Sequence, residues 1–184
     1  MSDDAVYAAG RVSTERSGPP RQTSRRTGLK TKRCRGADLT IVADVGGADG
    51  APPILFMHGG GQTRHSWKRT ARRAVERGYR VISIDLRGHG ESDWAQGAYR
   101  LYDYVADARA LAREIGQAVA VVGASLGGPT GLMLAGEEGP SLVRAFVPHA
   151  EYLNVEGADH MIAGDRNDAF NDAVFDFLDR HQPP

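Results

Sequence analysis

The segment 123–128 reads Gly-Ala-Ser-Leu-Gly-Gly and contains the pattern Gly-x-Ser-x-Gly. It lies between an apolar run at 118–122 and a stretch with helical spacing, which is the strand–turn–helix context that this pattern needs to present a reactive serine. The serine hydroxyl would then project at the N-terminus of a helix, where partial positive charge favours an oxyanion. We therefore expect Ser125 to be a nucleophile. Close packing of a helix on a sheet is the other explanation for these glycines.

A second glycine-rich segment, His-Gly-Gly-Gly at 58–61, follows the apolar run 53–57. A backbone N–H in such a turn can point at a developing oxyanion, beside the N–H of the residue that follows the nucleophile. We expect the backbone of Gly60 and Leu126 to form this oxyanion hole. The alternative is a turn that only changes the direction of the chain.

A third segment, Asp-Leu-Arg-Gly-His-Gly-Glu-Ser at 85–92, follows the next apolar run. Its density of glycine and short polar residues predicts a tight loop at the border of the site. We expect Asp85, Arg87 and His89 to fix the shape of this loop rather than to take part in chemistry.

Strand-like and helix-like patterns alternate along the chain from residue 38 onward. The expected strands are 39–45, 53–57, 80–85, 118–122, 142–147 and 150–155, and the expected helices are 67–77, 101–115, 128–135 and 166–180. This alternation predicts the α/β class, with a mostly parallel sheet flanked by helices. The continuous apolar run 118–122 is typical of a central strand buried on both faces. The last helix is expected to pack through Phe170, Val174, Phe177 and Leu178.

Charge divides the 184-residue chain into a basic start and an acidic body. Lys plus Arg and Asp plus Glu both number 23, yet the first 36 residues hold nine basic and three acidic side chains. Few of those residues are apolar, so we expect 1–36 to be a disordered basic tail and 37–182 to be one domain. The tail predicts weak electrostatic association with polyanions and no specific nucleic-acid recognition.

Other classes of protein are disfavoured by what the sequence holds. Cys34 is the single cysteine, no Cys/His cluster has zinc-ligand spacing, and 123–128 is not the dinucleotide-binding pattern Gly-x-Gly-x-x-Gly. We therefore expect no metal and no cofactor. No stretch approaches the roughly 18 apolar residues of a membrane span, and there is no apolar signal segment, so we expect a cytoplasmic location.

The order of these motifs, followed by Gly-Ala-Asp-His-Met at 157–161, resembles the α/β-hydrolase superfamily over about residues 38–180. The stretch from His58 to Trp67 is most similar to the cofactor-free haloperoxidase and epoxide-hydrolase-like branch. The resemblance implies that Ser125 attacks a carbonyl carbon and that His160 takes the serine proton. Epoxide hydrolases usually carry aspartate at the nucleophile position, so a serine implies an ester or related small acyl substrate, or perhydrolysis.

The sequence departs from this family in the distance between nucleophile and base. Ser125 and His160 are only 35 residues apart, whereas the family inserts a cap and further strands there. The sequence therefore predicts an internally shortened α/β-hydrolase fold that lacks the cap and the βα unit carrying the acid, and no acid is assigned. Loss of the orienting acid costs roughly 10⁴ in turnover. Two hypotheses stay open: a serine hydrolase of impaired activity, and a non-catalytic hydrolase remnant or binding protein.

Overall fold

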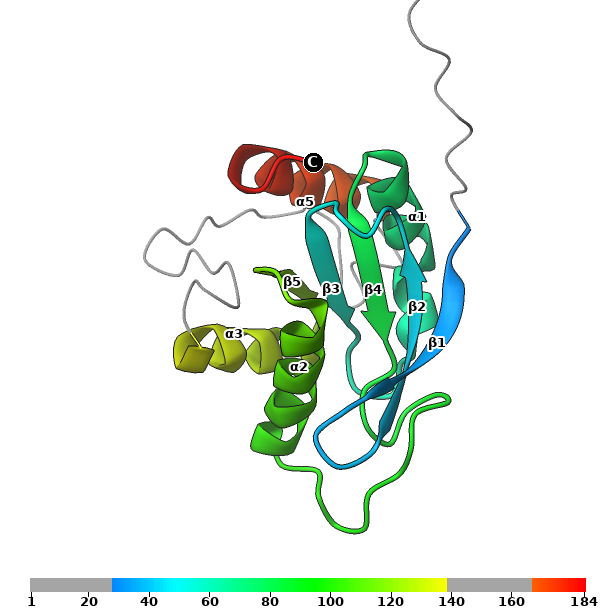
Figure 1. The fold of residues 1–184 in the computed structure, drawn as a ribbon, viewed down its shortest axis with the longest axis vertical. Coiled ribbons are helices and arrows are strands. Elements are labelled where there is room, and N and C mark those ends of the chain that lie inside the picture. The colour runs from blue at the N-terminus through cyan, green and yellow to red at the C-terminus, as the bar shows by residue number, and fades with distance from the viewer. Residues whose placement is uncertain (1–27, 139–166) are drawn as a thin grey trace, which may run out of the picture.

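One sheet of five strands organises the part of the chain that the computed structural model describes, residues 28–138 and 167–184 (Figure 1). The strands are β1 (Lys30–Arg35), β2 (Thr40–Gly46), β3 (Pro53–Met57), β4 (Arg80–Ile84) and β5 (Ala120–Gly123), in the order β1-β2-β4-β3-β5. The helices are η1 (Arg64–Trp67), a 3-10 turn, and α1 (Lys68–Glu76), α2 (Leu101–Ile115), α3 (Gly127–Glu138) and α5 (Asn167–His181). The class is α/β, as the alternating pattern predicts.

The sheet carries helices on both faces, because alternate residues of its strands are apolar on opposite sides. Leu55 and Met57 of β3 belong to a core with α2 and α3. Ile54 and Phe56 belong to a second core with α1 and α5. All five residues of β3 are buried, so both faces of β3 are covered.

Three parallel strands bring the three motifs to one edge of the sheet. β4, β3 and β5 are parallel neighbours, and Met57 is paired with Ile84 on one side and with Gly123 on the other. The segments that follow these residues therefore begin side by side, and these segments are 58–63, 85–92 and 124–126. Open α/β sheets place their chemistry at this end of the strands.

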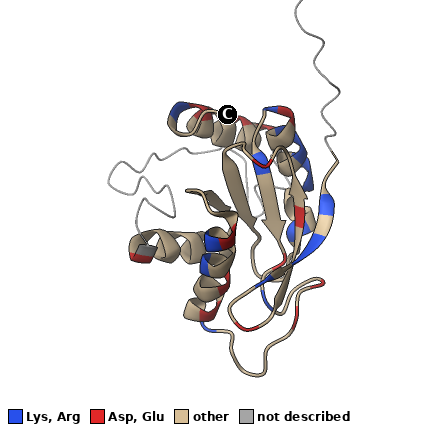
Figure 2. Cartoon of the chain, in the orientation of Figure 1, with Lys and Arg blue, Asp and Glu red and all other residues tan. Residues whose placement is uncertain are grey.

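The expected tail is wrong over residues 30–35, which form β1 (Figure 2). β1 pairs antiparallel with β2 over six positions, from Lys30 opposite Val45 to Arg35 opposite Thr40. Low apolar content misleads here because an edge strand is stabilised by backbone hydrogen bonds and leaves its side chains in water. Charged side chains are common on edge strands, since they hinder pairing with other chains. The rest of the expected tail, 1–27, lies outside the described residues.

Within the described residues β5 is the last strand of the sheet, with Val121 and Val122 half-buried, and the expected central position of this strand stays untested. One expectation about packing needs correction. In α5 the fully buried aromatic residue is Phe175, whereas Phe177 is half-buried and contacts His181. The spacing of apolar residues around Leu178 allows either Phe175 or Phe177 to face the core. Phe175 is the one that is buried, because it packs against α1. The expected strands 142–147 and 150–155 lie outside the described residues.

Helix α5 is held on α1 by apolar and charged contacts. Phe175 lies under the guanidinium groups of Arg73 and Arg77. Arg73 also binds Asp172 at 2.9 Å, and Arg77 binds Asp179 at 2.7 Å. None of the helices in the described ranges is long and apolar enough to cross a membrane.

Removing residues 1–36 should destabilise the protein, whereas removing 1–27 should not. The longer deletion takes away β1 and exposes the edge of β2. A loss of about 1 kcal/mol lowers Tm by about 2–4 °C in a chain of this size, and we expect the longer deletion to exceed that shift. Thermal melts of the two variants and the full chain measure the effect; equal Tm values would contradict a structural role for β1.

Candidate active site

Ser125 lies on a sharp turn between β5 and α3. It is exposed, and its φ of 46° makes it the one non-glycine residue with a left-handed backbone in the described part of the chain. This conformation costs on the order of 1–3 kcal/mol for a residue with a side chain. Contacts on either side hold it, because Ala124 N–H donates to Met57 O at 3.1 Å and Gly128 N–H donates to Ser125 O at 2.9 Å.

Glycine is required on both sides of this turn for a steric reason. A methyl group at Gly123 would collide with the backbone of Gly127, and one at Gly127 would collide with the carbonyl of Met57. The chain can therefore cross over the end of β3 only where these two residues lack side chains. The Gly-x-Ser-x-Gly pattern is thus explained by the close approach of α3 to β3, and that approach also lifts the serine out of the surface.

The turn 58–62 lies directly beside Ser125. A methyl group at Gly59 would come within 3.2 Å of the Ser125 Cβ atom. The Gly59 N–H donates to Gln62 Oε1 at 2.9 Å, and the Gly61 N–H donates to His89 Nε2 at 3.3 Å. The N–H groups of Gly60 and Leu126 have no hydrogen-bond partner within residues 28–138 and 167–184. Their expected role as an oxyanion hole stays a prediction.

His58 is a buried anchor for this turn rather than a reactive group. Its Nε2 accepts a hydrogen bond from Leu86 N–H at 3.0 Å, so its Nδ1 carries the proton and donates to Gly59 O at 2.7 Å. Burial lowers the pKa of His58 below its ordinary value of 6.5, an effect that the hydrogen bond to Gly59 partly opposes. His58 is therefore neutral in the folded protein at pH 7.

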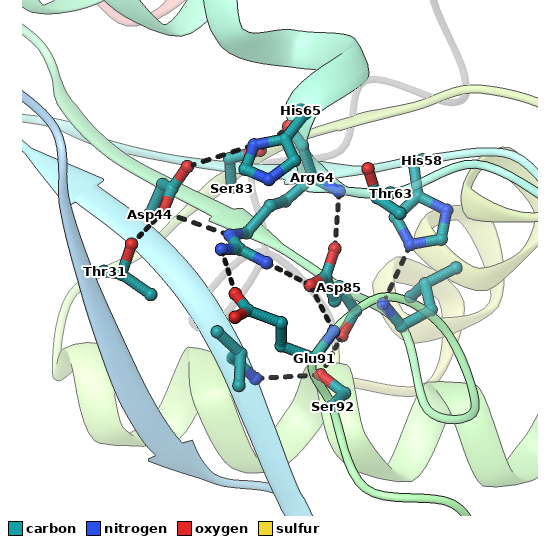
Figure 3. Close-up of polar contacts among 12 residues, drawn as sticks. Thr31, Asp44, His58, Thr63, Arg64, His65, Ser83, Asp85, Glu91 and Ser92 are labelled. Carbon is teal, nitrogen blue, oxygen red and sulfur yellow. Dashed lines mark hydrogen bonds and ion pairs between the residues drawn. The ribbon is translucent and has the colours of Figure 1, made fainter.

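Arg64 connects three segments of the chain through three carboxylates (Figure 3). Its side chain is 5% exposed; Nε donates to Asp44 at 3.0 Å, and the terminal nitrogens donate to Asp85 and Glu91. Burial alone would lower the pKa of Arg64, but the hydrogen bonds to these carboxylates outweigh it and raise the pKa. The Arg64 N–H also donates to Asp85, at 2.6 Å. Each of the three guanidinium nitrogens of Arg64 therefore donates to a carboxylate.

The loop 85–92 is fixed by its own polar groups, which confirms the expectation for Asp85 and Arg87. Asp85 also accepts from Glu91 N–H at 3.0 Å. Arg87 forms a two-bond pair with Asp107 of α2 at 2.7 and 2.9 Å, and these hydrogen bonds raise its pKa. Both side chains are buried by protein and engaged with structural partners, so neither is placed to meet a substrate.

Of the four residues that the sequence assigns to the site, Ser125 and Leu126 lie on the turn after β5, and Gly60 lies in the neighbouring turn, which meets Ser125 at Gly59. His160, the expected base, lies outside the described residues. Within those residues Ser125 Oγ has no hydrogen-bond partner, and no group of three or more His, Cys, Asp or Glu side chains could hold a metal ion. The described structure therefore shows an exposed serine hydroxyl on a strained turn that lies next to the glycine turn 58–62.

Sequence reasoning missed Arg64. It follows the glycine turn without any spacing that suggests chemistry, and its partners come from positions 44, 85 and 91. A charged residue two positions after a predicted active-site turn is the one available signal, and that signal is weak because arginine is usually exposed.

Replacing Asp85 by Asn should affect stability far more than the chemistry of the site. Breaking a buried ion pair costs about 3–5 kcal/mol; because Arg64 keeps Asp44 and Glu91, we expect about 2–3 kcal/mol of unfolding free energy to be lost. Asp49→Asn, at a residue whose side chain is 99% exposed, is the control and should change stability by less than about 0.5 kcal/mol. Urea melts measure both. A fully stable Asp85→Asn protein that had lost activity would instead make Asp85 part of the chemistry.

The titration of His58 should show a pKa below 6.5 and the Nδ1–H tautomer at neutral pH. Because the unfolded chain would bind a proton at His58 more readily than the folded chain, this residue should reduce stability as the pH falls through about 6.5. Nitrogen-detected NMR of the imidazole gives both the tautomer and the pKa. A His58 pKa at or above 6.5, or a proton on Nε2, would contradict the anchor role.

Comparison with known proteins agrees with this geometry. The family described as the alpha/beta hydrolase fold matches residues 52–171. An esterase of Mycobacterium tuberculosis, Rv0045c, is 39% identical over 101 residues, which cover 53% of this chain and 32% of the esterase. A non-heme haloperoxidase of Rhodococcus erythropolis is 40% identical over 77 residues, covering 41% of this chain and 28% of the relative. A fluoroacetate dehalogenase of a Burkholderia species is 33% identical over 134 residues, which cover 68% of this chain and 43% of the dehalogenase.

Solved structures show the same fold. The epoxide hydrolase VrEH1 of Vigna radiata superposes with a TM-score of 0.61 at 24% identity, over 65% of this chain and 39% of that enzyme. The chain spans less than half the length of these relatives. The resemblance predicted from the order of the motifs is confirmed: the chain belongs to the α/β-hydrolase fold family.

Proposed function

We propose that this protein is a serine hydrolase that acts on a small ester or related acyl substrate, with Ser125 as nucleophile and His160 as base. The observation that carries the proposal is a strained, exposed serine next to the glycine turn 58–62, in which the Gly60 N–H has no hydrogen-bond partner among the described residues. Strain of this kind persists only where surrounding contacts impose it, and it occurs often at active sites.

The reaction would proceed by acyl transfer through the enzyme. Ser125 Oγ forms a bond to the carbonyl carbon as its proton passes to His160, and the carbonyl oxygen becomes an oxyanion bound by the N–H groups of Gly60 and Leu126. The C–O bond to the alcohol then breaks, and His160 returns the proton to the departing oxygen. Water, deprotonated by the same base, then attacks the acyl carbon; the bond from this carbon to Ser125 Oγ breaks, His160 returns the proton to Oγ, and the carboxylic acid is released.

Several features of the described structure support an ester rather than an epoxide as the substrate class. Opening an epoxide through a covalent intermediate needs a carboxylate nucleophile, and position 125 holds a hydroxyl. The buried carboxylate of Asp85, in the loop after β4, is bound to Arg64 on one side and to the Glu91 N–H on the other. Perhydrolysis, in which hydrogen peroxide replaces water as the acceptor, uses the same acyl-serine.

Ser125→Ala should reduce the hydrolysis of short p-nitrophenyl esters to the uncatalysed background. Removing the nucleophile of a serine hydrolase removes the covalent route altogether. Ser66→Ala is the matched control, because the Ser66 hydroxyl donates to Thr63 O at 2.9 Å and is not part of the turn that holds Ser125. Its loss should leave the rate unchanged. Initial rates at several ester concentrations measure both variants.

Two outcomes would overturn the proposal. Full activity in Ser125→Ala would show that the nucleophile assignment is wrong. A folded wild-type protein that hydrolyses no ester would favour the second hypothesis, a non-catalytic hydrolase remnant or binding protein.

A further inference from the structure

Two histidines connect the glycine turn 58–62 with the loop 85–92, and each accepts a hydrogen bond from the backbone of the other segment. His58, from the turn after β3, accepts a hydrogen bond from Leu86 N–H of the loop after β4. His89, from that loop, accepts a hydrogen bond from Gly61 N–H of the turn. The two rings meet edge to face, with centroids 5.0 Å apart and planes inclined at 61°. Each segment thus contributes one acceptor to the other.

The tautomer of His89 follows from its second contact. Its Nδ1 lies 3.0 Å from Arg87 O, and a carbonyl oxygen can only accept, so Nδ1 carries the proton. The Nε2 atom is the acceptor, since the Gly61 N–H donates to it. Since Arg87 is itself held by Asp107, the ring of His89 is oriented from a rigid part of the loop.

The contact at Gly61 completes the positioning of Gly60. The Gly59 N–H is occupied by Gln62 and the Gly61 N–H by His89, whereas the Gly60 N–H between them has no partner in the described structure. Gly61 has a φ of 74°, a conformation that glycine adopts without strain. With its neighbours tied on both sides, the peptide of Gly60 loses freedom to rotate, and this matters because an oxyanion donor must keep its direction during reaction.

We propose that His89 is a positioning residue: by accepting the Gly61 N–H, it holds the Gly60 N–H in the direction needed for an oxyanion hole. The catalytic part of this inference rests on the proposed hydrolase function. The structural part, that His89 restrains the glycine turn, stands independently and can be measured on the folded protein.

The structural part is tested by amide exchange with two substitutions of His89. His89→Phe keeps a ring against His58 but removes the acceptor, whereas His89→Gln places an amide oxygen near the position of Nε2. By NMR, the Gly61 amide should exchange with water at least about tenfold faster in His89→Phe, and near the wild-type rate in His89→Gln. The Gly59 amide, bound to Gln62, is the internal reference. Unchanged Gly61 exchange in a folded His89→Phe protein would overturn the inference.

The catalytic part is tested by steady-state kinetics of the same variants. Misdirection of one oxyanion donor should lower kcat for p-nitrophenyl esters by about tenfold to hundredfold in His89→Phe, with little change in KM or Tm, and His89→Gln should restore most of the loss. A parallel loss in both variants, or a loss that follows Tm, would contradict positioning. If His89→Phe does not fold, His89→Ala gives the same comparison. If the wild type hydrolyses no ester, the oxyanion role falls with the proposed function, and Gly61 exchange still decides whether His89 restrains the turn.

Discussion

The buried guanidinium of Arg64 is the interaction on which the arrangement of this sheet edge depends. A charge removed from water is strongly unfavourable unless it is paired and hydrogen-bonded, and Arg64 meets this condition through carboxylates on β2 and on the loop after β4. Its own backbone contributes as well, since its N–H donates to Asp85 and its carbonyl accepts from Ser83 Oγ at 3.1 Å.

Only Gln62 and Thr63 separate Arg64 from Gly61, the last glycine of the turn, so the contacts of Arg64 also restrain the candidate site. Arg64 follows the glycine turn almost directly, so it fixes the far end of that turn, while His58 fixes the near end from within the core. Between these anchors, in the turn that meets Ser125 at Gly59, the Gly60 N–H has no hydrogen-bond partner in the described part of the chain. The polar network around Arg64 and the strained turn at Ser125 are therefore structurally linked. In the proposed mechanism, the rigid contacts at both ends of the glycine turn keep the Gly60 N–H directed toward the substrate.

What the sequence could predict depended on whether the determining contacts are local. The strand at 53–57, the helix at 101–115 and the serine elbow are specified by apolar runs, helical spacing and glycines within a few residues, and the structure has them at those positions. β1 and Phe175 were mispredicted because a distant partner decides each of them: β2 supplies the pairing edge, and α1 selects the buried ring. Arg64 escaped notice for the same reason, since its three carboxylates are about 20 or more residues away in the chain.

The central claim is that Ser125 is an activated nucleophile, and covalent labelling tests it most directly. The folded protein, verified by a cooperative thermal melt, would be treated with a fluorophosphonate probe and examined by intact-mass and peptide mass spectrometry. The account predicts one adduct per chain, on Ser125, that is absent after Ser125→Ala. A folded protein that takes up no probe, or that takes it up elsewhere while Ser125 stays unmodified, would contradict the account.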